Sequence, residues 1–109
     1  MTALVLGIGN DWRGDDAAGL EVARRLRAAG VRAAGSAGDP SGLLDAWDGE
    51  REVILVDAVR SGAAPGTLHR LDARARPLPA RLFRGSTHHL SVADAVELGR
   101  ALGRLPERL

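Results

Sequence analysis

Hydrophobic positions along the chain divide it into short strand-like and helix-like stretches. Residues 3–8 and 52–57 are continuous apolar runs, which is the pattern of parallel strands covered on both faces. Residues 31–34 form a weaker second strand, and residues 67–71 alternate weakly in the manner of an edge strand. The pattern therefore predicts a small sheet with two well-marked strands and two weaker ones.

Apolar residues at helical spacing, or turn residues that start a helix, mark the helices. We predict three of them, over residues 15–29, from residue 40 or 41 to 47, and from about 91 to 102. Gly30 is placed to end the first helix and Gly103 to end the last. Residues 61–66 and 72–87 are predicted to be loops, and the second is long enough to suggest a functional role.

Strands that alternate with helices indicate an α/β fold, in three α/β/α layers around a mainly parallel twisted sheet. At this length, residues 1–109 make one domain. Right-handed connections place the first strand between the second and the third. The carboxyl ends of the first and third strands then flank a crevice where such sheets usually bind ligands.

Composition excludes several classes of protein. The chain has no cysteine, which rules out disulfides, thiolate metal sites and a cysteine nucleophile. No apolar run is long enough for a membrane span, and the first residues lack the basic start of a signal peptide. All fifteen basic residues are arginine, but none form a basic stripe with interleaved aromatics. We therefore expect a cytoplasmic protein that binds neither membrane nor nucleic acid.

Two carboxylates and an imidazole fall at element ends and suggest a metal site. Asp15 and Asp16 follow the first strand, Asp57 ends the third, and His88 and His89 precede the last helix. Such a ligand set, with positions open to water or a guest ligand, suits a borderline divalent ion such as nickel or zinc. Neighbouring side chains on an extended segment point apart, so one metal takes one histidine of the pair.

Each of these residues also has an interpretation without a metal. Asp15 or Asp16 caps a helix, Asp57 forms a turn, and either neighbouring histidine lies at the surface. His69 is expected to be structural or exposed. A small α/β domain without metal function therefore stays open as an alternative.

Other functions of a glycine-rich turn are excluded by the residues that follow. The Gly7-Ile8-Gly9 start lacks the third small residue of a dinucleotide fingerprint, because Trp12 stands there. A phosphate-binding loop needs a lysine, and the chain has none. There is no GxSxG nucleophile elbow either.

Four segments together resemble the hydrogenase maturation endopeptidases, and they follow the order and approximate spacing of that family. They are GIGNDWRGDDAAG at 7–19, LVDAV at 55–59, PGTL at 65–68 and STHHLSVADAV at 86–96. The resemblance covers nearly the whole chain. It implies a phosphorylase/hydrolase-like fold and a protease that trims the large subunit of nickel-iron hydrogenase at its C-terminus after nickel insertion.

The resemblance also implies a set of site residues. Asp16, Asp57 and His88 correspond to the family's metal-binding trio, with Asp16 where relatives often have Glu and His88 favoured over His89. The implied metal is nickel carried by the substrate, for which zinc or another divalent ion substitutes in vitro. As an aspartic-type endopeptidase it would use Asp16 and Asp57 in catalysis, either as a general base or by polarising water.

One departure from the family concerns the end of the chain. Relatives continue beyond the position of Pro106 with another strand and a closing helix, so this chain is C-terminally shortened by comparison. We therefore expect an exposed apolar surface that includes Ile54, Val56, Val96 and Leu102, and self-association or binding of a partner through it. A catalytically inactive nickel- or partner-binding module is the alternative function.

Overall fold

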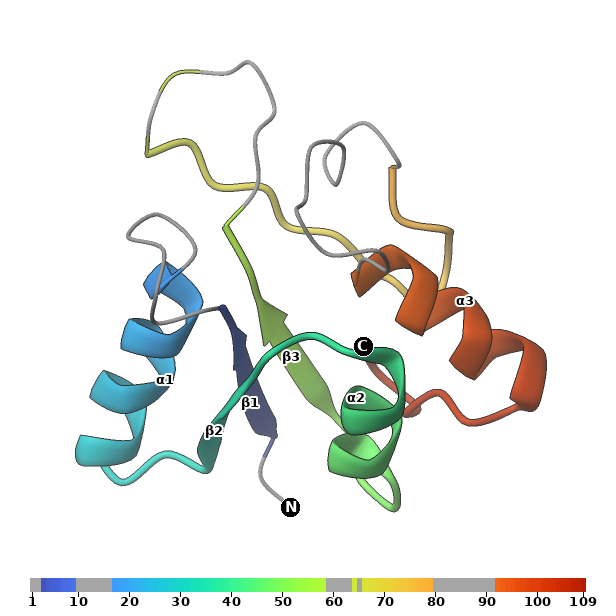
Figure 1. The fold of residues 1–109 in the computed structure, drawn as a ribbon, viewed down its shortest axis with the longest axis horizontal. Coiled ribbons are helices and arrows are strands. Elements are labelled where there is room, and N and C mark those ends of the chain that lie inside the picture. The colour runs from blue at the N-terminus through green and yellow to red at the C-terminus, as the bar shows by residue number, and fades with distance from the viewer. Residues whose placement is uncertain (1–2, 10–16, 59–63, 65, 80–91) are drawn as a thin grey trace.

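The computed structural model describes residues 3–9, 17–58, 64, 66–79 and 92–109, and these form one α/β unit (Figure 1). Its elements alternate as the hydrophobic pattern predicts. In chain order they are β1 (Leu4–Ile8), α1 (Ala18–Ala28), β2 (Ala33–Ser36), α2 (Pro40–Trp47), β3 (Val53–Val56) and α3 (Val92–Leu102).

The sheet has the order β2-β1-β3, and both pairs of neighbours are parallel. Leu6 lies opposite Leu55, and Gly7 lies opposite Val56. The predicted strand order is therefore confirmed, with β1 in the centre. Because all three strands run the same way, their carboxyl ends lie at the same edge of the sheet.

Helices cover both faces of β1, which gives three layers. Leu6 and Ile8 belong to a buried cluster with residues of α2 and α3. Gly7 points to the opposite face, where Ala23 of α1 lies against it. Figure 1 shows α1 on one side of the sheet and the pair α2 and α3 on the other. The three-layer arrangement is thus set by the alternation of side chains along β1.

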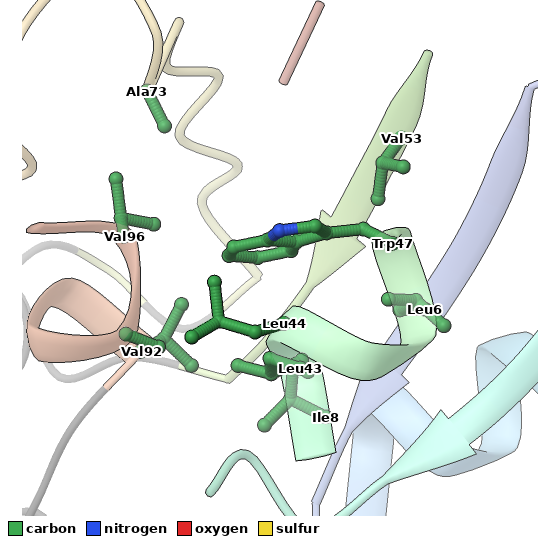
Figure 2. Close-up of a cluster of buried hydrophobic side chains, with 10 residues drawn as sticks. Leu6, Ile8, Leu43, Leu44, Trp47, Val53, Ala73, Val92 and Val96 are labelled. Atoms are coloured by element: carbon green, nitrogen blue, oxygen red, sulfur yellow. The ribbon is translucent and has the colours of Figure 1, made fainter. Parts of the chain in front are cut away.

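Most of the core lies between the sheet and the two helices α2 and α3 (Figure 2). Leu43, Leu44 and Trp47 enter it from α2, and Val92 and Val96 enter from α3. The indole Nε1 of Trp47 donates a hydrogen bond of 2.8 Å to the backbone carbonyl of Arg104. The large side chain is therefore buried without leaving its N–H unpaired.

Local signals at the helix ends account for the helix bounds. The side chain of Asp39 accepts a 2.8 Å hydrogen bond from the backbone N–H of Gly42, and Pro40 occupies the first turn of α2. Gly30 and Gly103, which follow α1 and α3, have φ angles of +86° and +67°. Both glycines end their helices as expected, because the left-handed region is strained for other residues.

The prediction of an edge strand at residues 67–71 is wrong. This stretch forms no strand, and Leu68 is 95% exposed. Thr67 instead folds back locally, since its hydroxyl donates a 2.6 Å hydrogen bond to the carbonyl of Ala64. A weak alternation needs a partner strand to become β structure, and no neighbouring strand is supplied at this point by the part of the chain that the structure describes.

The expected apolar surface is present in part. Ile54 and Leu102 are 49% and 55% exposed, as predicted, and Val56 is half-buried. Val96 was wrongly included, because it is fully buried against α2. Ile54 lies opposite Val5 on the face that α1 covers, but α1 packs over β1 and β2 and leaves this side of β3 exposed.

The last residues run beside the start of β3. The N–H of Val53 donates to the carbonyl of Arg108, and the N–H of Arg108 donates to the carbonyl of Arg51, at 3.0 and 2.9 Å. Glu52 and Arg108 form a parallel bridge. No helix among the described residues is long and apolar enough to cross a membrane.

Candidate functional site

The carboxyl edge of the sheet carries the one predicted site residue that the structure describes. Asp57 follows Val56, the last residue of β3, and its side chain is half-buried. The neighbouring strand β1 ends at Ile8. Asp57 therefore lies where the ends of β1 and β3 meet, at the edge where the sequence predicts the crevice.

The start of α1 is pressed against both of these strand ends. A Cβ placed on Gly19 would lie 2.6 Å from the carbonyl oxygen of Val56, and it would clash directly with the carbonyl oxygen of Ile8. Real Cβ atoms essentially never come that close to backbone atoms. Only glycine fits here, and it brings the first turn of α1 into backbone contact with the residue that precedes Asp57.

A second glycine sits on the other side of the same contact. A Cβ on Gly7 would lie 2.7 Å from the carbonyl carbon of Gly19 and 2.9 Å from the Cβ of Ala23. The central strand and the helix therefore meet backbone to backbone, with no side chain between them. This close approach holds the beginning of α1 in one position relative to the sheet.

Four of the predicted site residues lie outside the described residues: Asp15, Asp16, His88 and His89. The convergence of Asp16, Asp57 and His88 is therefore neither confirmed nor contradicted, and it stays a prediction. Within residues 3–9, 17–58, 64, 66–79 and 92–109, no three His, Cys, Asp or Glu residues group in a way that would hold a metal. His69 is exposed, in agreement with its expected minor role.

The segment that leads toward His88 is fixed more firmly than a loop prediction suggests. The carboxylate of Asp72 accepts hydrogen bonds of 3.1 Å from the N–H groups of Arg74 and Ala75. The guanidinium of Arg100, on α3, donates to the carbonyls of Ala73 and Arg74 at 2.6 and 2.8 Å. Sequence reasoning missed Arg100, because the only local signal is Glu97 three residues earlier, which suggests nothing beyond a surface ion pair.

The carboxylate of Glu21, near the start of α1, is paired with two arginines of the same helix. Arg24, and then Arg25, donate hydrogen bonds to Glu21 and lower its pKa from 4.5 to about 2. Glu21 also lies in the first turn, where negative charge is favoured by the helix dipole. Its charge is therefore balanced within α1.

Comparison with known proteins gives one finding. The model of the HycI hydrogenase maturation protease family matches residues 24–109. The match includes Asp57 and His88, and it begins after Asp16. No curated protein and no solved structure matches the chain.

Proposed function

Because the chain belongs to the hydrogenase maturation protease family, we propose that it removes the C-terminal extension of a nickel-iron hydrogenase large-subunit precursor after nickel insertion. In this proposal the precursor is met in the cytoplasm. Asp16, Asp57 and His88 recognise the nickel that the precursor already holds. The metal thus belongs to the substrate and signals that the precursor is ready to be cut.

The main support for the proposed nickel site is the close approach of Gly19 to the carbonyl of Val56. Asp57 follows Val56, and Asp16 precedes Gly19 by three residues. Three residues span at most about 11 Å even when extended, and this limit supports the proposal that Asp16 reaches the carboxyl end of β3. In this proposal, two carboxylates 41 positions apart in the sequence come together at one edge of the sheet.

The family match supports the proposed roles of Asp57 and His88. Asp57 and His88 both fall inside the matched range, in segments separated by the loop region. His88 precedes α3 by four residues, and Val92, the first residue of that helix, is buried in the core with Ile8. Val92, four residues after His88, therefore belongs to the same core as the last residue of β1.

The proposed ligand set has a chemical logic. A neutral imidazole and two carboxylates suit a borderline divalent ion and leave positions for ligands from the substrate. Nickel held there draws electron density from a bound water or a carbonyl oxygen. A carboxylate oxygen of Asp16 or Asp57 that does not bind the metal would then accept the proton of the attacking water.

The test is cleavage of a hydrogenase large-subunit precursor, with and without nickel, by the wild-type chain and by Asp57→Asn. Asp57→Asn keeps the shape of the side chain and removes its charge. We expect the wild type to cut only the nickel-loaded precursor, and Asp57→Asn to lose this activity.

Asp45→Asn is the matched control, because Asp45 is an exposed carboxylate on α2, away from the carboxyl edge of the sheet. It should cleave as the wild type does. Nickel binding without cleavage by the wild type would favour the inactive metal-binding module instead. Cleavage that proceeds equally without nickel would overturn the proposed recognition of the metal.

A further inference from the structure

Residues 72–76, which we call the 72–76 turn, are bonded to α3 by one arginine side chain. Arg100 donates from Nη2 to the carbonyl of Ala73 at 2.6 Å and from Nη1 to the carbonyl of Arg74 at 2.8 Å. Its Nε donates to the carboxylate of Glu97, one turn earlier on α3, at 3.1 and 3.2 Å. The guanidinium is therefore fixed to its own helix while it holds the backbone of a turn that belongs to no helix or strand.

A second arginine links the same turn to residues 105–109, which we call the tail. Arg74 donates from Nη1 to the carbonyl of Pro106 at 3.0 Å. The N–H of Ala73 donates to the carbonyl of Leu109 at 2.9 Å. The turn is therefore bonded to α3 on one side and to the tail on the other.

The tail covers the start of the outer edge of β3. Arg108 donates its N–H to the carbonyl of Arg51 at 2.9 Å, and its carbonyl accepts the N–H of Val53 at 3.0 Å. The residue between these two, Glu52, turns its carbonyl to the opposite side, where the N–H of Leu4 in β1 donates to it. Uncovered backbone groups at the edge of a sheet invite pairing with another chain. The tail therefore closes part of an edge that is prone to such pairing.

Apolar burial holds the turn and the tail only weakly. Their buried side chains are those of Ala73 and Pro106, and both are small. Leu105 and Leu109 are half-buried against the core, and the other side chains of the two segments are exposed. Hydrogen bonds from charged donors are stronger than those from neutral donors, so the two arginines supply a large share of the attachment. Segments held in this way open more readily than the core does.

We infer that Arg74 and Arg100 form a two-arginine latch, which makes the 72–76 turn and the tail open and close as one unit, separately from the rest of the fold. When Arg100 releases the turn, the turn no longer holds the tail. When Arg74 releases the tail, the turn loses the neighbour on its other side. Opening uncovers the start of the outer edge of β3, and closing covers it again. The latch is independent of the proposed nickel site.

Amide hydrogen exchange of the full chain, followed residue by residue by NMR, tests the latch in the wild type, Arg100→Gln and Arg74→Gln. The N–H of Ala73 reports on the turn, and the N–H groups of Val53 and Arg108 report on the tail. Within each variant all three should exchange faster by the same factor. This factor should be roughly tenfold or more, which corresponds to the loss of one hydrogen bond from a charged donor.

Two comparisons separate the latch from a general loss of stability. The N–H of Val5, which donates to the carbonyl of Arg32, lies outside the unit and should keep its wild-type exchange rate. Arg104→Gln is the matched control, because Arg104 lies just after α3 and its side chain pairs with Asp48 at 3.7 Å instead of with the turn. It should leave all of these exchange rates unchanged. Arg100→Lys keeps the charge and one donor group, so its effect should be smaller than that of Arg100→Gln, and it replaces that variant if Arg100→Gln does not fold.

The pattern of exchange rates decides the outcome. If Arg100→Gln accelerates Ala73 and leaves Val53 and Arg108 at the wild-type rate, the turn and the tail are independent and the latch is overturned. Acceleration of Val5 by the same factor would show that the whole fold opens, which also overturns it. Wild-type rates throughout, or the same acceleration in Arg104→Gln, would show that the two arginines do not hold the unit closed.

Discussion

Gly7 and Gly19 meet backbone to backbone, so that a Cβ on Gly7 would lie 2.7 Å from the carbonyl carbon of Gly19. A side chain at either position would push α1 away from β1. Because Gly19 also touches the carbonyl of Val56, the same displacement would move the start of the helix away from Asp57. The pair of glycines therefore links the packing of the fold to the geometry of the proposed site.

Gly19→Ala should destabilise the protein by about 1–3 kcal/mol, the usual cost of forcing an extra carbon into a packed contact. The neighbours it meets are backbone atoms of Ile8 and Val56, which cannot rotate aside. Urea unfolding measures the change in the free energy of unfolding. Under the proposed function the variant should also bind nickel more weakly, because the start of α1 moves away from Asp57.

Gly35→Ala is the control for this prediction. A Cβ on Gly35 would come within 2.8 Å of the Leu20 side chain, whose terminal methyl group is free to move. We expect a smaller loss of stability and unchanged nickel affinity. Equal effects of Gly19→Ala and Gly35→Ala would show that the contact at Gly19 has no special role.

Asp57→Asn is predicted to weaken nickel binding far more than it weakens the fold. The substitution keeps the shape and hydrogen-bonding oxygen of the side chain but removes the charge that attracts the metal. If Asp57 serves only as a turn residue, the main effect would be a stability loss of about 1 kcal/mol or less from changed hydrogen bonds. Calorimetry with nickel and urea unfolding, made on the same samples, distinguish the two outcomes.

The order of elements and the strand order were readable from the sequence because local rules determine them. Apolar runs mark β1 and β3, and the positive φ angles at Gly30 and Gly103 match the predicted helix ends. The second helix was placed correctly because Pro40 is a strong local signal for a first turn. Parallel pairing then leaves few topologies to choose from.

The predictions that the structure contradicts concern features that depend on tertiary contacts. The alternation at residues 67–71 looked like a strand, but β structure requires a neighbour to pair with. Val96 is expected at the surface from the sequence, but it is buried. Its burial depends on how α2 packs against α3, and no local pattern shows this. The contacts of Arg100 are not predictable from the sequence for the same reason. The carbonyls that it binds lie on a turn whose position no local pattern specifies.

The helix cap at Asp39 gives a prediction of stability against pH. The N–H of Gly42, and then the hydroxyl of Ser41, donate hydrogen bonds to the carboxylate and hold the pKa of Asp39 below its ordinary value of 3.8. Asp39→Ala should therefore cost about 1 kcal/mol at neutral pH. A lowered pKa means that the stabilisation from the charge is fully present above pH 3.8 and is lost as the pH falls through the lower value in the folded state.

Asp39→Asn separates the hydrogen bond of the cap from the titration of its carboxylate. It keeps an oxygen that accepts the Gly42 N–H, but it has no proton to gain. Its stability should follow the pH more weakly than that of the wild type in the range below pH 3.8, as measured by unfolding at a series of pH values. Identical pH profiles for the wild type and Asp39→Asn would contradict the assignment of this titration to the cap.

The last prediction concerns association through the exposed side of β3. Ile54 is 49% exposed in β3, on the face where α1 packs mainly over β1 and β2. An apolar side chain on an uncovered sheet face favours contact with another apolar surface, and a second copy of the chain offers the same one. Sedimentation at micromolar concentration should therefore show an average mass that rises with concentration.

Ile54→Thr keeps the branched shape that suits a strand and adds a hydroxyl, so it should shift the chain toward monomer without unfolding it. Leu68→Ser is the matched control, because Leu68 is 95% exposed but lies outside the sheet, and its replacement should leave the mass distribution unchanged. A monomer at every concentration would show that the exposed side of β3 makes no contact between copies. An equal shift with both variants would point to general hydrophobic association instead of an interface at the sheet.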